Sequence, residues 1–305
     1  MGSLSTANVE FCLDVFKELN SNNIGDNIFF SPLSLLYALS MVLLGARGES
    51  AEQLEKVLHF NHTVDSLKQE FKDSPKCSQA GRIHSDFDVL FSQINQPDSN
   101  YALSIANRLY GTKMMAFHQG KNVTVEMMYQ IGTFKLAFVK EPQMQVLELP
   151  YVNNKLSMII LLPVGTDNLK QIEKQLNSKM FHEWTSSSNM MEREVEVHLP
   201  RFKLEMKYEL NSLLKSLGVT DIFNQAKADL SGMSPAKGLY LSKAVHKSYL
   251  DVSEEGTEAA AATGESIAVK SLPMRAQFMA NHPFLFFIRH TDTNMILFCG
   301  KLASP

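Results

Sequence analysis

The chain has 305 residues, 45% of them hydrophobic, and a formal net charge of -3. This length and composition allow one large domain, or two small ones, with a core large enough to fold without disulfide bonds. Lys and Arg residues are scattered rather than gathered on one face, which argues against nucleic acid as a partner. No apolar run is long enough to span a bilayer and the N-terminus has no export signal, so we expect a soluble, cytoplasmic protein with no membrane partner.

The cysteines predict no metal site. Cys12, Cys77 and Cys299 are far apart in the sequence and have no His or Cys at zinc-binding spacing. An odd number of cysteines without close pairs fits a reducing compartment. The glycosylation sequons at Asn61 and Asn122 have meaning only in an exported chain, so we expect both to be unmodified. No cofactor is implied.

The first hundred residues are predicted to be mostly helical. Val9, Leu13 and Phe16 recur at helical spacing, and apolar residues between 83 and 94 do the same. Residues 61–81 are polar and weakly periodic, which fits either a short helix with a loop or an irregular excursion. The apolar stripes indicate core faces rather than binding surfaces.

Further along, the pattern changes to interleaved strands and helices. Residue 218 is a glycine that ends the second of two predicted helices, and residues 291–294 join the strands of a predicted buried hairpin at the C-terminus. Strands are expected at 103–105, 123–127, 145–149, 156–162, 195–199, 284–288 and 296–299, and helices at 169–176 and 210–217.

The local signatures of catalysis are absent from the sequence. It contains no nucleophile elbow, no zinc-protease motif, no phosphate-binding glycine loop and no Cys-x-x-Cys. His246 could act as a general base or as a hydrogen-bonding strand residue, and without a nearby nucleophile the second interpretation is favoured. The methionines have no companion ligands and fit core filling. We therefore predict that the chain is not an enzyme.

Residues 254–264 form an unusual stretch, Glu-Glu-Gly-Thr-Glu-Ala-Ala-Ala-Ala-Thr-Gly, with small residues and no apolar period. A linker or a short alanine helix is one interpretation. Three distant segments favour another, because they and this stretch resemble serpins, specifically the ovalbumin-type (clade B) intracellular branch. These segments are Asn27-Ile-Phe-Phe-Ser-Pro-Leu-Ser34, Asn281-His-Pro-Phe-Leu-Phe-Phe287 and Leu297-Phe-Cys-Gly-Lys-Leu-Ala-Ser-Pro305.

The resemblance implies an α+β serpin fold, with helices packed on β-sheets, as a single domain of residues 1–305 with an exposed reactive loop at about 254–275. In serpins a target protease cuts this loop. The acyl-enzyme is then trapped when the loop inserts as a new strand of the main sheet. The metastable native fold supplies the driving force.

The same resemblance assigns the site residues. Counting from Gly256 places the scissile bond at Lys270-Ser271, and a lysine there suits trypsin-like proteases, whose pocket carboxylate would pair with it. Arg275 is a second, less favoured cleavage site. The hinge that enters the sheet first is made mainly of small residues: Glu254, Gly256, Thr257, Ala259, Ala260, Ala261 and Ala262.

Further positions match residues beneath and above the main sheet of serpins. Ser31, Pro32 and Ser34 match the cluster called the shutter. His246 matches the histidine on the strand that leads to the loop, and Arg201 with Glu254 matches a charge pair at the strand tops.

The chain departs from the family pattern after Gln119. It continues directly with Gly120, where serpins have on the order of eighty further residues. The missing block would hold two helices, an edge strand and the strand beside which the loop inserts, so the main sheet is expected to be incomplete. The strand at about 239–252 would become an unpaired edge that favours self-association.

Three functions remain open at this point. The first is a protein that offers Lys270 to trypsin-like proteases and is cleaved as a substrate, because insertion is impaired. The second is an active suicide inhibitor, if the remaining strands rearrange around the intact hinge. The third is a structural or binding protein without inhibitory activity.

Overall fold

A computed structural model describes residues 2–22, 24–60, 85, 87, 89, 112–119, 121–151, 154–165, 168–253 and 275–305. The helices are α1 (Gly2–Asn22), α2 (Pro32–Gly45), α3 (Gly48–Val57), α6 (Asn168–Gln175), α7 (Ser178–Trp184), α8 (Leu210–Leu217) and the short η2 (Asp221–Phe223). The strands are β1 (Ile28–Phe30), β2 (Thr112–Gln119), β3 (Lys121–Val139), β4 (Met144–Pro150), β5 (Leu156–Pro163), β6 (Met191–Pro200), β7 (Phe202–Glu209), β8 (Val245–Val252), β9 (Ala276–Met279), β10 (Phe284–His290) and β11 (Ile296–Leu302). None of the described helices combines the length and apolar character needed to cross a membrane.

The chain divides into two compact units, and the first comprises residues 1–101, 205–249 and 287–300. It holds α1, α2, α3 and α8. Helix α2 is apolar on nearly all sides, which is typical of a buried helix, and α1 contacts both α2 and α8. Asn8 on α1 fixes the helix to β11, because its side chain donates to the Ile296 carbonyl (3.2 Å) and accepts from the Ile296 N–H (2.7 Å).

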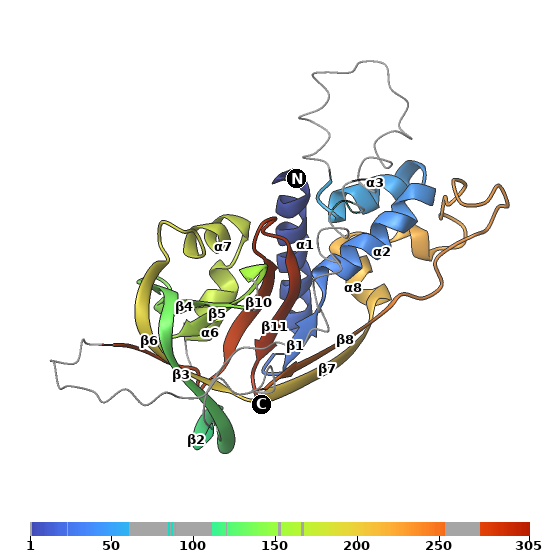
Figure 1. The fold of residues 1–305 in the computed structure, drawn as a ribbon. Coiled ribbons are helices and arrows are strands. Elements are labelled where there is room, and N and C mark those ends of the chain that lie inside the picture. The colour runs from blue at the N-terminus through green and yellow to red at the C-terminus, as the bar shows by residue number, and fades with distance from the viewer. Residues whose placement is uncertain are drawn as a thin grey trace, which may run out of the picture. The chain divides into compact units, whose positions relative to one another are not determined.

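The second unit comprises residues 102–204, 250–286 and 301–305, and it is built around a sheet. Its strand order is β10-β5-β4-β3-β6-β9, with β2 paired to β3 (Figure 1). Strand β5 lies inside this order and is buried along its whole length, as its continuous apolar sequence predicts. Helix α6 contacts β5.

The long strand β3 organises this sheet. Its first part pairs antiparallel with β2, its middle with β6 and its end with β4. The β2–β3 register pairs Gln119 with Lys121 and His118 with Asn122, so the two sides of the predicted break form the two arms of one hairpin. The hairpin is drawn in green in Figure 1.

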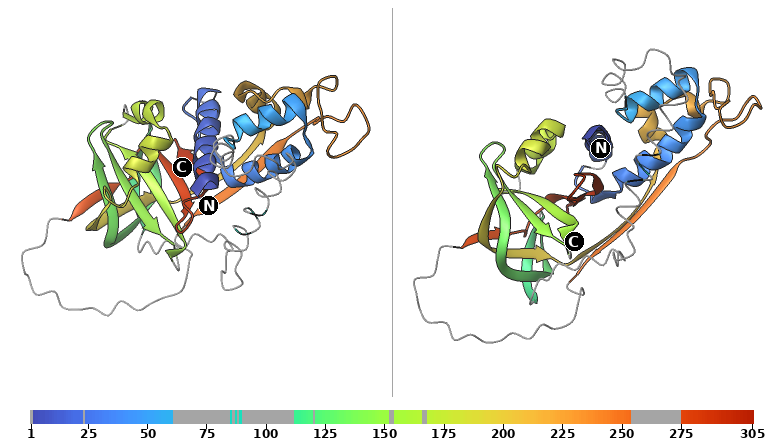
Figure 2. Two further views of the ribbon diagram at one scale, coloured as in Figure 1. Left: turned by 90° about the horizontal axis from the view of Figure 1, so that it is seen from above. Right: turned by 45° about the horizontal axis from the view of Figure 1, so that its top comes forward.

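Strands β7 and β8 form a separate two-stranded sheet, seen as a long ribbon in both views of Figure 2. Burial alternates along β8 as in a strand with one covered face, with His246, Ser248, Leu250 and Val252 buried. The adjoining helix α8 ends where the sequence predicts, because Gly218 takes the left-handed conformation at φ 113°.

The α+β fold class with an incomplete main sheet is confirmed, and so are the predicted elements around 169–176, 195–199, 210–217 and the C-terminal hairpin. Two boundaries differ. Strand β3 continues to Val139, well beyond the predicted end. The predicted edge strand at 239–252 begins only at Val245, because the Ala244 N–H and carbonyl bond the Asn211 side chain (2.8 Å) and the Leu210 N–H (2.9 Å) at the start of α8.

Candidate functional site

The reactive loop itself lies outside the described residues. This applies to the predicted scissile residues Lys270 and Ser271 and to every predicted hinge residue: Glu254, Gly256, Thr257, Ala259, Ala260, Ala261 and Ala262. The strands that lead into and out of the loop are described. They are β8, which ends at Val252, and β9, which begins at Ala276.

The strand on the exit side of the loop is held at several points. Strand β9 pairs in parallel with β6 over Val195 to His198. Just before it, the Arg275 guanidinium donates through Nε to Glu194 on β6 at 2.8 Å. The Arg275 side chain is therefore engaged with the sheet.

The strand on the entry side is held along one edge. Strand β8 pairs with β7, and two ion pairs join these strands, the exposed Lys247–Glu205 (2.6 Å) and the partly buried Lys203–Asp251 (2.9 Å). Lys247 also lowers the pKa of Glu205 through a hydrogen bond and its charge. Among the described residues, no strand pairs with the other edge of β8.

Beneath β8, the structure brings the predicted Ser31, Ser34 and His246 together. The Ser31 N–H donates to His246 Nε2 at 3.0 Å. The Ser31 hydroxyl donates to the Leu297 carbonyl (2.8 Å) and accepts from the Ser34 N–H (3.2 Å), which makes Ser31 the N-cap of α2. Pro32 follows as the first helical residue, where its missing N–H costs nothing.

The protonation state of His246 follows from this geometry. Burial lowers the pKa of His246 below its usual value, and its Nε2 accepts a hydrogen bond. The ring is therefore neutral, with its proton on Nδ1. It serves as a structural acceptor, the role that the sequence favoured over that of a general base.

Two partners in the same cluster were not predicted from the sequence. The Ser248 hydroxyl donates to the Phe29 carbonyl at 2.8 Å, and the Tyr208 hydroxyl accepts from the Phe29 N–H at 3.2 Å. Ser248 lies two residues after His246, on the same buried face of β8. A polar residue at a buried strand position is the signal that would have revealed it. We call Ser31, His246, Ser248, Tyr208 and Phe29 the β8 anchor.

Arg201 lies between β6 and β7, and the residue it contacts is Glu126. Its N–H donates to the Glu126 carbonyl (2.8 Å), and Nη1 lies 3.4 Å from the Glu126 carboxylate. The predicted partner Glu254 lies outside the described residues.

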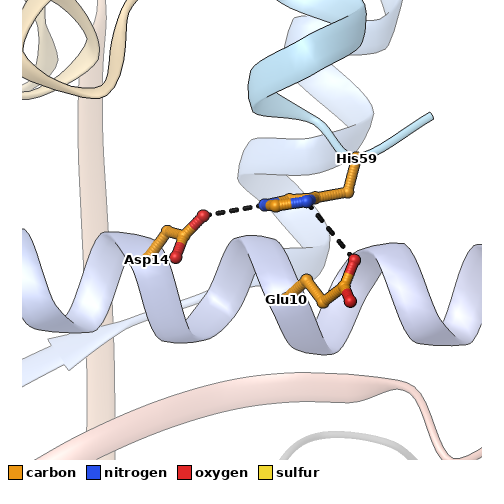
Figure 3. A network of polar contacts seen from close by, with 3 residues as sticks. All are labelled: Glu10, Asp14 and His59. Carbon is orange, nitrogen blue, oxygen red and sulfur yellow. Dashed lines mark hydrogen bonds and ion pairs between the residues drawn. The ribbon is translucent and has the colours of Figure 1, made fainter. Parts of the chain in front are cut away.

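A further polar network, also missed, lies away from β8. The His59 ring lies between two carboxylates of α1, with Nε2 2.7 Å from Asp14 and Nδ1 3.3 Å from Glu10 (Figure 3). The hydrogen bond to Asp14 is the main cause that raises the pKa of His59. His59 lies just after the end of α3, with a left-handed backbone at φ 57°. Its ring contacts with Asp14 and Glu10 attach this helix end to α1.

No group of three His, Cys, Asp or Glu side chains suited to a metal ion occurs in the part of the chain that the structure describes. Comparison with known proteins identifies the family to which the chain belongs. The serpin (serine protease inhibitor) family model matches residues 6–120 and 111–305, nearly the whole sequence. The chain therefore belongs to the serpin family of serine protease inhibitors.

The relatives place it in the ovalbumin-type branch. Human Serpin B11 is 71% identical over 392 aligned positions, and human leukocyte elastase inhibitor is 37% identical over 396, each over the full length of both chains. The crystal structure of uncleaved ovalbumin matches with a TM-score of 0.76 and 30% identity, again over 100% of both chains. In the Serpin B11 alignment, 87 positions (392 minus 305) face no residue of this chain.

Proposed function

We propose that this chain offers Lys270-Ser271 to trypsin-like serine proteases and is cleaved as a substrate, without forming a stable inhibitory complex. The observation that carries this proposal is the length of the chain: in the alignment with Serpin B11, 87 positions (392 minus 305) face no residue of it. A loop that inserts as a central strand needs a hydrogen-bonded ladder on each side. The resemblance to serpins implies that the missing block holds the strand beside which the loop would insert.

The size of the effect follows from the lost ladder. A strand of about six hydrogen bonds, at about 0.5 to 1.5 kcal/mol each, contributes on the order of 3 to 9 kcal/mol. Because folded proteins are stable by only about 5 to 15 kcal/mol, this loss is large enough to decide between trapping and release of the protease.

We place the missing block of the single serpin domain between Gln119 and Gly120. Two observations support this position. The two family matches meet and overlap at residues 111–120, and the alignment with Serpin B11 leaves 87 positions (392 minus 305) without a residue of this chain. The structure adds that residues 112–119 pair with β3, so this segment is engaged elsewhere than at β8.

Lys270 is the preferred cleavage site because the alternative, Arg275, is engaged. The Arg275 side chain is bound to Glu194, and the residue after it begins the paired strand β9. Proteases bind their substrates as extended segments, so cleavage at Arg275 would require β9 to leave the sheet.

An active suicide inhibitor is the alternative function. The β8 anchor favours it, because Ser31, which matches the shutter of serpins, and His246, which matches the histidine on the strand that leads to the loop, are hydrogen-bonded to each other here. If the remaining strands rearranged around an inserted loop, the Ser31–His246 hydrogen bond would already be formed beneath β8, the strand that enters the loop.

We propose a cytoplasmic location and, at high concentration, association of two chains through an edge of the β7–β8 sheet. Cys12 and Cys299 are both buried and free, as expected for a reducing compartment. Burial and a hydrogen bond to Cys12 raise the pKa of the Cys299 thiol well above its usual value, which keeps it protonated and unreactive. Light scattering as a function of concentration tests the association.

Two linked measurements test the proposed function. Trypsin digestion with mass mapping should give a first cut after Lys270, which Lys270→Ala removes and the matched Arg275→Ala leaves unchanged. The melting temperature of the cut protein should then lie within about 2 °C of that of the intact one, the equivalent of about 1 kcal/mol for a chain of this length. A much larger rise on cleavage would mean that the loop has inserted, and would favour the inhibitor.

A further inference from the structure

A modification site emerges from a surface segment that the inhibitory function does not use. The sequence contains four Ser-Pro dipeptides, which begin at Ser31, Ser74, Ser234 and Ser304. Only Ser234 has a basic residue three positions later, Lys237. It lies in the first compact unit, in the connection between η2 and β8.

The turn that precedes Ser234 is fixed to the corner between α2 and α3. The Gly232 N–H donates to the Gly45 carbonyl (2.9 Å), and the Arg47 N–H donates to the Asp229 carbonyl (2.9 Å). The Arg47 guanidinium lies so close to Gly232 that a Cβ there would be 2.6 Å from it. This side of the serine is therefore held in place.

The segment that follows Ser234 is exposed to solvent and has no regular secondary structure. Pro235, Ala236 and Lys237 are exposed, and residues 234–244 contain no helix or strand. The Ser234 side chain is half-buried, and its oxygen accepts a single weak local bond from the Ala236 N–H at 3.2 Å. Little has to be broken to present this hydroxyl in an extended backbone.

We propose that Ser234 is the phosphate acceptor for a proline-directed serine/threonine kinase, with Pro235 and Lys237 as the recognised neighbours. Proline has no N–H, so it fits a pocket that offers no hydrogen-bond acceptor and rejects other residues there. Lys237 supplies a positive charge for an acidic patch of the kinase.

The transfer uses ATP as the co-reactant. The Ser234 oxygen attacks the γ-phosphorus of ATP, a new oxygen–phosphorus bond forms, and the bond from that phosphorus to ADP breaks. The hydroxyl proton passes to the catalytic carboxylate of the kinase, and ADP leaves. The phosphate adds a charge of about -1.5 to -2, two residues after the Gly232 backbone on which Arg47 lies.

A second Ser-Pro dipeptide offers a comparison, although Ser34 stands where Ser234 has Lys237. Ser31 is followed by Pro32, as Ser234 is by Pro235, but Ser31 is only 9% exposed. Its hydroxyl bonds the Leu297 carbonyl and caps α2, so it is unavailable without unfolding. The same dipeptide should therefore be modified at Ser234 and not at Ser31.

The test incubates the full chain with a purified proline-directed kinase that prefers a basic residue at the third position, and with magnesium and ATP. Mass mapping should locate one phosphoryl group on Ser234. Ser234→Ala should abolish it. Pro235→Ala, which keeps the serine, should lower kcat/KM about 10-fold to 200-fold through the lost pocket contact. Lys237→Ala should lower it less.

Three results would overturn the proposal: no incorporation by the folded chain, incorporation that persists in Ser234→Ala, or rates unchanged in Pro235→Ala. Far-ultraviolet circular dichroism of each variant should match that of the parent chain, because the three side chains lie outside helices and strands. A heat-unfolded sample of the parent chain, in which Ser234 is fully exposed, shows that the kinase is active on this sequence.

Discussion

The strands on the two sides of the reactive loop are held differently. On the exit side, β9 pairs with β6, and Arg275 is bound to Glu194. On the entry side, β8 has β7 along one edge and, within the described chain, no strand along the other. A hairpin such as β2–β3 can form from residues next to each other in the chain, whereas a second partner for β8 has to come from a distant segment.

The largest effect is expected from breaking the hairpin that closes the proposed junction. Phe117 on β2 is fully buried, so Phe117→Ala should destabilise the protein by about 3 to 5 kcal/mol in urea unfolding. Met114→Ala on the same strand is the control, because that side chain is 62% exposed and its loss should cost no more than about 0.5 kcal/mol. Equal effects of the two substitutions would mean that β2 is not packed on its unit.

A smaller effect is expected from breaking the β8 anchor. Ser31→Ala removes the cap of α2 and leaves the Leu297 carbonyl without its donor, which should cost about 1 to 3 kcal/mol. Ser34→Ala is the matched control, because only its backbone N–H takes part and its side chain is exposed. Thermal melts of both variants give the comparison, and a Ser34→Ala effect as large as that of Ser31→Ala would contradict it.

The sequence predicted the elements whose hydrogen bonds are local or whose burial is uniform. The helix that ends at Gly218 and the C-terminal hairpin belong to this group. Contacts between residues far apart in the sequence were not predicted. No spacing rule links Phe29 to Tyr208 or His59 to Asp14, because tertiary packing brings these residues together across many intervening positions. The resemblance to serpins pointed to Ser31 and His246, and the structure places them in contact.

The smallest effect concerns pH and lies away from the loop. The pKa of His59 is raised in the folded protein, so its contribution to stability is complete below the unfolded value of 6.5 and is lost as the pH rises through the folded value. The loss should be about 1 kcal/mol or less, because the pair with Asp14 is partly exposed.

His59→Asn is the variant that isolates this effect, because asparagine tolerates the left-handed backbone and does not titrate. The difference in unfolding free energy between parent and variant should shrink as the pH rises from 6 to 8. His246 acts in the opposite direction, since its lowered pKa removes stability as the pH falls below 6.5, and it cancels in this difference. A difference that does not depend on pH would contradict the account.

The central claim is that the chain offers its loop but does not trap the protease. It is tested most directly by mixing the protein with trypsin at equal concentration and counting, on a denaturing gel, chains that are cleaved and chains that run as a covalent adduct with the protease. We expect cleaved chains with almost no adduct, and neither product at early times from Lys270→Ala. A stable adduct that accounts for most of the protein would contradict the claim and establish an active inhibitor.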